Sequence, residues 1–196
     1  SFPTRRSSDL KQIYIEAKAH GINALDAPVS GGDIGAKNSN LTIMVGGDQD
    51  IFEKMEPIFK LMGKNIILQG DAGAGQHTKM CNQIAIASNM IGVCEAMIYA
   101  KKAGLNPQTV LKSIETGAAG SWSLSNLAPR MLKGDFDPGF YVKHFVKDMN
   151  IALSEAKDMD FDTPGLKLSK GLYDKLIAQG KENNGTQVLY QLLDES

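Results

Sequence analysis

The stretch G-D-A-G-A-G-Q-H-T-K-M-C-N-Q, residues 70–83, decides the fold of this 196-residue chain. It joins a short apolar segment, residues 65–69, to a long apolar segment with the character of a helix. Glycine lets the backbone turn sharply and lets another group approach it closely. Gly70, Gly73 and Gly75, which we call the glycine hook, therefore predict a tight turn between a strand and a long helix.

One polar face follows the glycine hook. Lys79, Asn82 and Gln83 lie three and four positions apart, so a helix places them side by side. A single ammonium beside two amides suits the binding of a small oxygen-rich substrate and the transfer of a proton. Most lysines near the start of a helix are solvated, so this pattern alone also fits an ordinary surface residue.

Two phosphate-binding motifs are excluded by the residues around the hook. A Walker loop needs Lys-Ser or Lys-Thr after its last glycine, and here Gln76 and His77 follow Gly75. The dinucleotide fingerprint needs the spacing G-x-G-x-x-G, whereas the hook has the reverse spacing and Thr78 stands where a third glycine would be needed. The hook therefore indicates a different use of glycine.

A second motif, D-A-P-V-S-G-G, occupies residues 26–32. Pro28 lacks a backbone donor, which suits the end or the edge of a strand. Ser30, Gly31 and Gly32 then offer a hydroxyl and two unshielded amides, and successive amides can form a concave anion site. Taken alone, Ser-Gly-Gly also fits a plain turn.

These two motifs and L-T-I-M-V-G-G, residues 41–47, closely resemble the β-hydroxyacid dehydrogenase family in order and spacing. That family includes 3-hydroxyisobutyrate dehydrogenase and tartronate semialdehyde reductase. The resemblance implies that Lys79 is the catalytic acid/base. The substrate-binding residues that it implies are Ser30, Gly31, Gly32, Asn82 and Gln83. Gln83 departs from the family pattern, which usually has asparagine at that position, so the amide reaches one methylene further.

A third segment, F-V-K-D-M-N-I-A-L at residues 145–153, also recurs in the family. The resemblance places Lys147 near the nicotinamide end of the cofactor, NAD or NADP. Without it, Lys147 and Asp148 would be interpreted as a solvated pair on a helix. The implied activity is an oxidoreductase that interconverts a β-hydroxyacid and its semialdehyde.

The fold that we expect is the α/β trailing part of a Rossmann-type domain followed by an all-α domain, similar to the C-terminal domain of 6-phosphogluconate dehydrogenase. The first part covers residues 11–75 and the second covers 76–196. Residues 1–10 have no apolar period and are expected to be non-native or disordered. Strands are expected over 22–27, 41–45 and 65–69, and helices over 11–20, 49–61, 76–103, 106–115, 125–132, 142–157, 166–179 and 187–193.

The dinucleotide fingerprint, G-x-G-x-x-G, does not occur in these residues, although family members carry it in their first strand and helix. We therefore expect a fragment that follows such a segment. Two alternatives stay open at this point. One is a catalytically silent folding or dimerisation fragment, and the other is a reductase of the same scaffold with another substrate.

Composition limits the partners. Lys plus Arg, 21, nearly balances Asp plus Glu, 22, so no basic surface argues for nucleic acid or an anionic membrane. The long apolar helix is interrupted by polar residues, which argues against a membrane span. Its apolar residues cover most of its circumference, so we expect a homo-oligomer.

Cysteine and histidine usage suggest an ordinary intracellular enzyme without a metal. Cys81 and Cys94 would lie on nearly opposite faces of one helix, so a disulfide between them is implausible and a cytoplasmic location is expected. The three histidines are scattered and have no cysteine or carboxylate at ligand spacing, so no metal site is expected.

Overall fold

A computed structural model describes residues 5–195, which divide into two compact units. The first unit comprises the residues up to Asn82 together with Ser154–Phe161, and the second comprises Gln83–Leu153 and the residues from Asp162 onward. Two long helices, α4 (Ala74–Lys102) and α8 (Val142–Asp158), contribute to both units. The strands end where α4 begins, close to the boundary at residue 75 that the sequence suggested, whereas the compact units divide inside α4.

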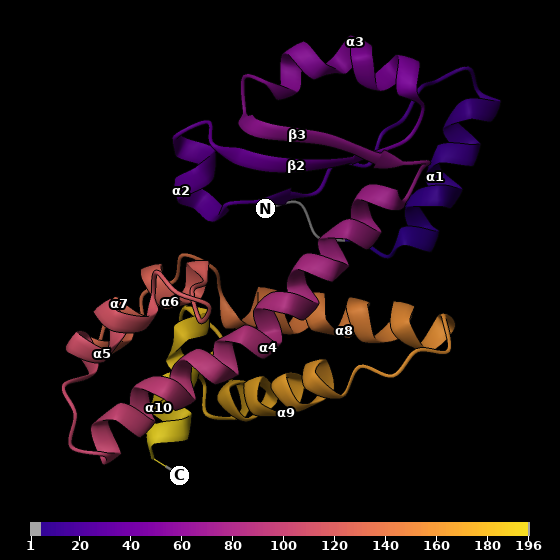
Figure 1. Ribbon diagram of the computed structural model, residues 1–196. Coiled ribbons are helices and arrows are strands. Elements are labelled where there is room, and N and C mark those ends of the chain that lie inside the picture. Colours follow the sequence, from indigo (N-terminus) through magenta and orange to yellow (C-terminus); the bar gives the residue numbers. More distant parts are fainter. Residues whose placement is uncertain (1–4, 196) are drawn as a thin grey trace. The chain divides into compact units, whose positions relative to one another are not determined.

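The first unit is a small mixed sheet with helices (Figure 1). The strands β1, β2 and β3 lie in that order, with β1 antiparallel to β2 and β2 parallel to β3. A helix, α3, makes the crossover between the two parallel strands, which is the βαβ connection of doubly wound folds. The elements are α1 (Ser7–Ala19), β1 (Val29–Ser30), α2 (Gly32–Lys37), β2 (Leu41–Gly46), α3 (Gln49–Phe59) and β3 (Gly63–Gly70).

The core of this unit forms between β2 and α3. Leu41, Ile43 and Val45 alternate along β2 and point to one face of the sheet. Phe52 and Phe59, seven residues apart on α3, cover that face. This packing confirms the expected α/β character of the first part of the chain.

Two expectations at the beginning of the chain were wrong. Residues 1–4 lie outside the described part. Because α1 begins at Ser7, the disorder expected for residues 7–10 is wrong, whereas the expected non-native origin of residues 1–10 stays a prediction. The amide of Ser7 donates to Glu155 at 3.1 Å, a contact distant in sequence that satisfies a donor in the first helical turn. The strand expected over 22–27 is reduced to an isolated bridge between Asp26 and Gly46, and the ladder resumes at β1, after Pro28.

The second unit is helical, as expected. It contains α4 from Gln83, α5 (Pro107–Ile114), α6 (Trp122–Asn126), α7 (Ala128–Leu132), α8 to Leu153, α9 (Pro164–Ala178), a 3-10 turn (Thr186–Val188) and α10 (Leu189–Asp194). Residues 125–132 were expected to form one helix. They instead belong to two helices, because Ser121 caps α6 and Pro129 lies in the first turn of α7. A proline is tolerated in a first turn because an amide there has no partner within the helix.

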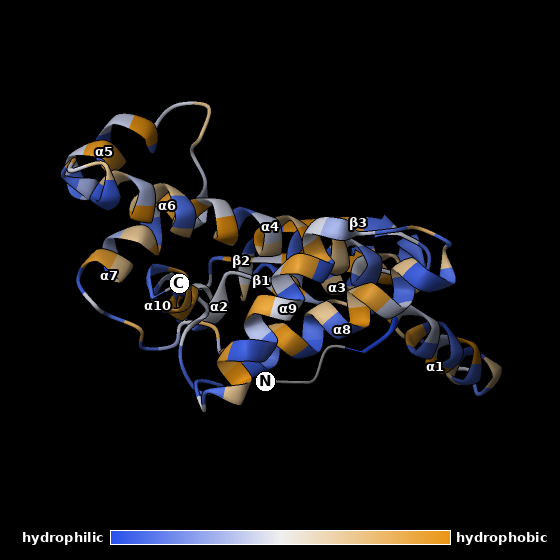
Figure 2. Ribbon diagram, turned by 90° about the horizontal axis from the view of Figure 1, so that it is seen from below, coloured by the Kyte–Doolittle hydropathy of each residue, from blue (hydrophilic) through white to orange (hydrophobic). Residues whose placement is uncertain are grey.

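The core of the second unit is rich in methionine and aromatic side chains. Met90 and Met97 of α4 are fully buried. Phe145 of α8 and Tyr173 of α9 meet edge to face with their ring centres 5.1 Å apart. Figure 2 shows hydrophobic and hydrophilic bands alternating along α8 and α9, as expected for helices with one packed face.

By length and composition alone, α4 could cross a membrane. Its 29 residues have a mean hydropathy of 1.3 in the most apolar window, and 39% of that window is buried within the protein. The fully buried Ala87, Met90 and Met97 belong to the core of the helical unit. We therefore assign the apolar character of α4 to a core helix.

Candidate functional site

The helix α4 carries the proposed acid/base near its start. Lys79 and Asn82 both belong to the first unit, lie one turn apart and are partly buried. Three residues along a helix bring two side chains to the same face. The structure therefore places this ammonium and this amide together, as the sequence predicted.

The start of α4 is held by a residue that the sequence reasoning did not single out, the Asp26 carboxylate. Its Oδ1 accepts the amide of Gly73 at 2.6 Å, and its Oδ2 accepts the amide of Gln76 at 2.9 Å. A carboxylate at this place satisfies first-turn amides and also interacts favourably with the helix dipole. The spacing from Asp26 to the hook gave no local signal, because the contact joins residues about fifty positions apart.

The segment Ser30, Gly31 and Gly32 forms the turn from β1 into α2. Gly31 has a φ of 129° and Gly32 a φ of 64°. Residues other than glycine rarely adopt such positive φ values. The carbonyl of Gly31 accepts the amide of Gly35 at 2.9 Å. Both glycines are thus required by the turn itself, and their proposed contact with a carboxylate stays a prediction.

Gln83 has a partner within the second unit. Its side chain is buried, and its Nε2 donates to Oδ2 of Asp148 on α8 at 2.7 Å. Nζ of Lys147 lies 3.2 Å from the other oxygen of Asp148, Oδ1, and the two groups form an ion pair. The geometry of this contact is not that of a hydrogen bond. Asp148 is therefore a buried carboxylate between two predicted site residues, Gln83 and Lys147, and not part of a solvated pair.

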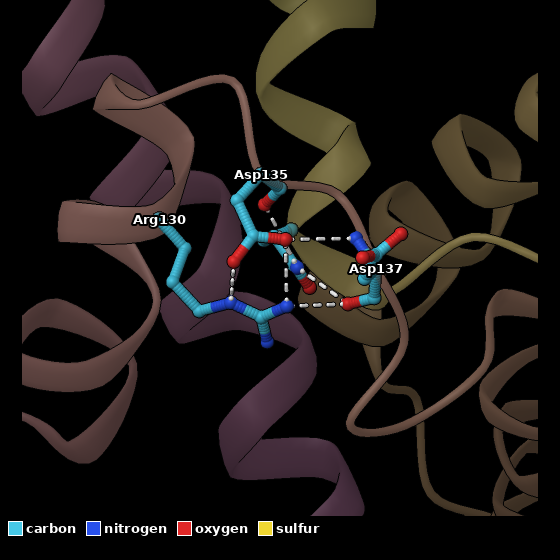
Figure 3. A network of polar contacts seen from close by, with 4 residues as sticks. Arg130, Asp135 and Asp137 are labelled. Carbon is cyan, nitrogen blue, oxygen red and sulfur yellow. Dashed lines mark hydrogen bonds and ion pairs between the residues drawn. The ribbon is translucent and has the colours of Figure 1, made fainter.

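A separate polar network fixes the loop that leads into α8 (Figure 3). Arg130 donates to both carboxylate oxygens of Asp135, at 2.7 and 2.9 Å, and to the carbonyl of Asp137 at 2.7 Å. The amide of buried Gln187 reaches the carbonyls of Asp135 and Asp137 at 3.2 and 3.0 Å. No local sequence pattern indicates this network of Arg130, Asp135, Asp137 and Gln187, which we call the arginine clamp.

The remaining buried ionisable groups of the second unit favour their neutral forms. Burial raises the pKa of the Cys94 thiol to about 12, and burial also raises the pKa of Tyr173 well above its ordinary value. A thiol of this kind is a poor nucleophile at neutral pH. Among residues 5–195, no group of three or more His, Cys, Asp or Glu side chains is arranged to hold a metal ion.

The donors on this chain fit one end of a nicotinamide dinucleotide. Lys147 keeps a side chain that is 38% exposed, so its ammonium is accessible to a polar group of a cofactor. The amides at the start of α4 do not provide a phosphate site, because the Asp26 carboxylate already accepts two of them. The hook thus offers no phosphate cradle, and the contact of Lys147 with the nicotinamide end stays a prediction.

Comparison with known families divides the chain close to the hook. Residues 73–193 match the family described as the NAD-binding domain of NADP-dependent 3-hydroxyisobutyrate dehydrogenase. Residues 2–70 match the NAD-binding domain of 6-phosphogluconate dehydrogenase. The two matches together cover nearly the whole chain.

Individual relatives agree with these matches. An uncharacterised oxidoreductase of Bacillus subtilis, YkwC, is 67% identical over 96% of this chain and 66% of its own length. The 2-hydroxy-3-oxopropionate reductase of Escherichia coli is 42% identical over 95% of this chain and 64% of its own length. The structure of a Mycobacterium tuberculosis 3-hydroxyisobutyrate dehydrogenase with L-serine superposes with a TM-score of 0.89, at 30% identity, over 97% of this chain and 67% of that one.

The chain thus spans about two thirds of the length of these relatives. The match to the 3-hydroxyisobutyrate dehydrogenase model covers more than half of the chain, and the structural likeness extends over both units. This agreement confirms the resemblance that the two glycine-containing motifs suggested. The chain belongs to the β-hydroxyacid dehydrogenase family of oxidoreductases, together with 3-hydroxyisobutyrate dehydrogenases and 2-hydroxy-3-oxopropionate reductases.

Proposed function

We propose that this chain carries the substrate-binding and proton-transfer residues of an NAD- or NADP-dependent β-hydroxyacid dehydrogenase. The observation that carries the proposal is the placement of Lys79 and Asn82 on one partly buried face of α4, directly after a hook held by hydrogen bonds. The proposed reaction interconverts a β-hydroxyacid and its semialdehyde. The names of the relatives in Escherichia coli and Mycobacterium tuberculosis support this substrate class.

Lys79 is the proposed acid/base. In the direction of oxidation, its neutral amine accepts the proton of the substrate hydroxyl while the carbon loses a hydride, so that a carbonyl forms. A bound nicotinamide supplies the acceptor for that hydride. In the direction of reduction, the ammonium returns the proton to the new alkoxide oxygen.

The other proposed residues bind and orient. Ser30 and the amides of Gly31 and Gly32 hold the substrate carboxylate, which does not react, and so fix the position of the carbon that does. Asn82 binds the reacting oxygen without adding a charge, and Gln83 completes the substrate contacts. Lys147 is assigned to the nicotinamide end of the cofactor.

The first test replaces Lys79. In the whole protein, Lys79→Ala should lower kcat by roughly 10²- to 10⁴-fold, because the proton no longer has a positioned acceptor. Lys79→Arg should be impaired as well, since a guanidinium stays protonated. Steady-state oxidation of 3-hydroxyisobutyrate and L-serine, and reduction of 2-hydroxy-3-oxopropionate, would measure the effect.

The matched control is Lys102→Ala, which removes an exposed lysine from the far end of the same helix. Its turnover should equal that of the parent. The dissociation constant for NAD or NADP should stay unchanged in the two Lys79 variants, because the residue is assigned to the substrate hydroxyl. Near-normal turnover by Lys79→Ala would remove the proposed role.

We also propose that the whole protein is a cytoplasmic homo-oligomer that binds neither nucleic acid nor membranes. Large apolar side chains of the second unit are exposed, including Tyr99 and Trp122 at 75% and 67%, and a second subunit would cover such groups. The reduced, buried Cys94 suits a cytoplasmic location. Light scattering at micromolar concentration that gave a monomer would count against the assembly.

A further inference from the structure

The Asp26 carboxylate lies at a junction of three segments of the first unit. Its side chain is buried and accepts the amides of Gly73 and Gln76. Its backbone pairs in both directions with Gly46 at the end of β2, at 3.0 and 2.8 Å. The two amides and the dipole of α4 stabilise its negative charge.

The space for this carboxylate is created by glycines. A Cβ added at Gly46 would lie 2.4 Å from Oδ1 of Asp26, and one added at Gly75 would lie 2.8 Å from Oδ2. Both distances are below 3.0 Å, which is closer than real Cβ atoms come to another heavy atom. Gly46 and Gly75 are thus required so that the carboxylate can reach the start of α4, and this accounts for glycine at two positions in the family motifs.

The same carboxylate connects two segments that the proposed function uses. Asp26 lies four residues before Ser30, in the segment that pairs with β2, and α4 begins at Ala74 and carries Lys79 in its second turn. A shift of Asp26 would therefore move the start of α4 relative to the segment that ends in Ser30. The hydrogen bonds that the buried carboxylate accepts from Gly73 and Gln76 restrict such a shift, because breaking them leaves a buried charge unpaired.

We propose that Asp26 is a positioning residue, which sets the place of Lys79 relative to the Ser30–Gly32 turn through the two amides that it accepts. It acts through the backbone, because its side chain is buried and both of its carboxylate oxygens accept amides. The inference rests on the proposed function for its effect on turnover, whereas the structural contact is independent of that function.

The first measurement uses this chain and compares Asp26→Asn with Asp50→Asn. Asparagine keeps the shape but turns an NH₂ group toward the amide of Gln76, whereas Asp50 is an exposed partner of Lys54 on α3. Amide exchange at Gly73 and Gln76 should become on the order of tenfold faster in Asp26→Asn only. The side-chain NMR signals of Lys79 should shift in that variant, while exchange along β2 stays unchanged.

The second measurement uses the whole protein and its turnover. Asp26→Asn should lower kcat roughly 10- to 100-fold, the effect of a small misplacement of a reacting group, with unchanged affinity for NAD or NADP. Asp50→Asn should have the kcat of the parent. A purely structural role would instead lower the active fraction, and with it cofactor binding capacity, without changing the turnover of the folded enzyme.

The outcomes of these two measurements decide whether Asp26 positions Lys79. Unshifted Lys79 signals, or an unchanged kcat in folded Asp26→Asn, would overturn it. Asp26→Ser adds no bulk and places no NH₂ group toward Gln76, so it replaces the asparagine variant if that variant does not fold. If neither folds, Asp26 is a stability residue only and the positioning role is rejected. A parent protein without β-hydroxyacid turnover would refute the proposed function, while the exchange and NMR measurements would still test the contact.

Discussion

The starts of α4 and α8 are fixed in two different ways. At α4, a buried carboxylate accepts the first amides, and glycines provide the space that it needs. At α8, the amides of Val142 and Lys143 donate to backbone carbonyls of Asn184 and Glu182, at 3.0 and 3.1 Å. The loop before α8 is held by the arginine clamp, whose ion pair between Arg130 and Asp135 is partly exposed.

This difference predicts how each region tolerates change. The start of α4 depends on close contact between backbone and carboxylate, so any added atom must displace the chain. The loop before α8 depends on ions in contact with solvent, which are weak and sensitive to salt and pH. The stability of the region that carries Lys79 should therefore fall when atoms are added to its backbone contacts. The stability of the region that leads to Lys147 should depend on salt concentration and pH.

The largest effect should come from adding one methyl group to the hook. In Gly75→Ala, the new Cβ would lie 2.3 Å from the carbonyl oxygen of Met44, so the start of α4 has to move away from β2. We expect a loss of about 3 kcal/mol in the free energy of unfolding, as for overpacking against backbone. Urea unfolding followed by circular dichroism would measure it.

Gly92→Ala is the matched control on the same helix. Nothing lies within 4 Å of a Cβ at Gly92, and alanine favours the helical conformation more than glycine. This variant should gain about 0.5–1 kcal/mol in stability. A similar stability for both variants would show that the hook has more room than the contacts with Met44 and Asp26 indicate.

A middle effect should follow from breaking the buried contact between α4 and α8. Gln83→Met keeps the approximate shape but removes the donor to Asp148, which leaves a buried carboxylate oxygen without its hydrogen bond. We expect a loss of about 2 kcal/mol. In the double variant Gln83→Met with Asp148→Leu, much of that loss should be recovered, since both polar partners are gone.

Gln49→Met provides the control for the chemical change itself, because Gln49 makes a comparable hydrogen bond to Glu53 on an exposed helix face. Its unfolding midpoint should stay close to that of the parent. If the two single variants lose equal stability, burial is not what distinguishes these contacts. That result would contradict the expectation that buried polar contacts contribute more to stability than exposed ones.

The smallest effect should be a dependence on pH at the arginine clamp. Arg130 donates to Asp135, and so does the amide of Asp137, which together lower the pKa of Asp135 from 3.8 to about 2. Because the pKa is lower in the folded chain, this carboxylate stabilises the fold above about pH 4, and the contribution disappears as the pH falls through about 2.

Asp135→Asn should therefore flatten the pH dependence of the unfolding midpoint between about pH 4 and 2, and Arg130→Ala should flatten it in the same way. Asp50→Asn, which removes one partner of an exposed ion pair on α3, is the control. An unchanged acid slope in Asp135→Asn would show that the clamp contributes nothing through its charge. Raising the salt concentration should reduce the effect in the parent.

Much of the fold could be predicted because its determinants are local. The apolar alternation of β2, the seven-residue spacing of Phe52 and Phe59 on α3, and the proline after Asn106 at the start of α5 are all visible in short windows. The placement of Lys79 and Asn82 on one face follows from helical periodicity alone. The expected start of α1 and the expected strand at residues 22–27 were wrong. At Ser7 the start of the helix depends on a distant partner, because the amide of Ser7 donates to Glu155.

The sequence by itself determined most of the long helices, the two parallel strands, the family and the candidate residues, because periodicity and the spacing of glycines are properties of neighbouring positions. Only the tertiary structure decided what the glycines are for. It placed Asp26 against Gly73 and Gln76, and Asp148 against Gln83, across separations of 47 to 65 positions. Such contacts leave no trace in a local pattern, because a carboxylate finds its donors only after the elements between them have packed.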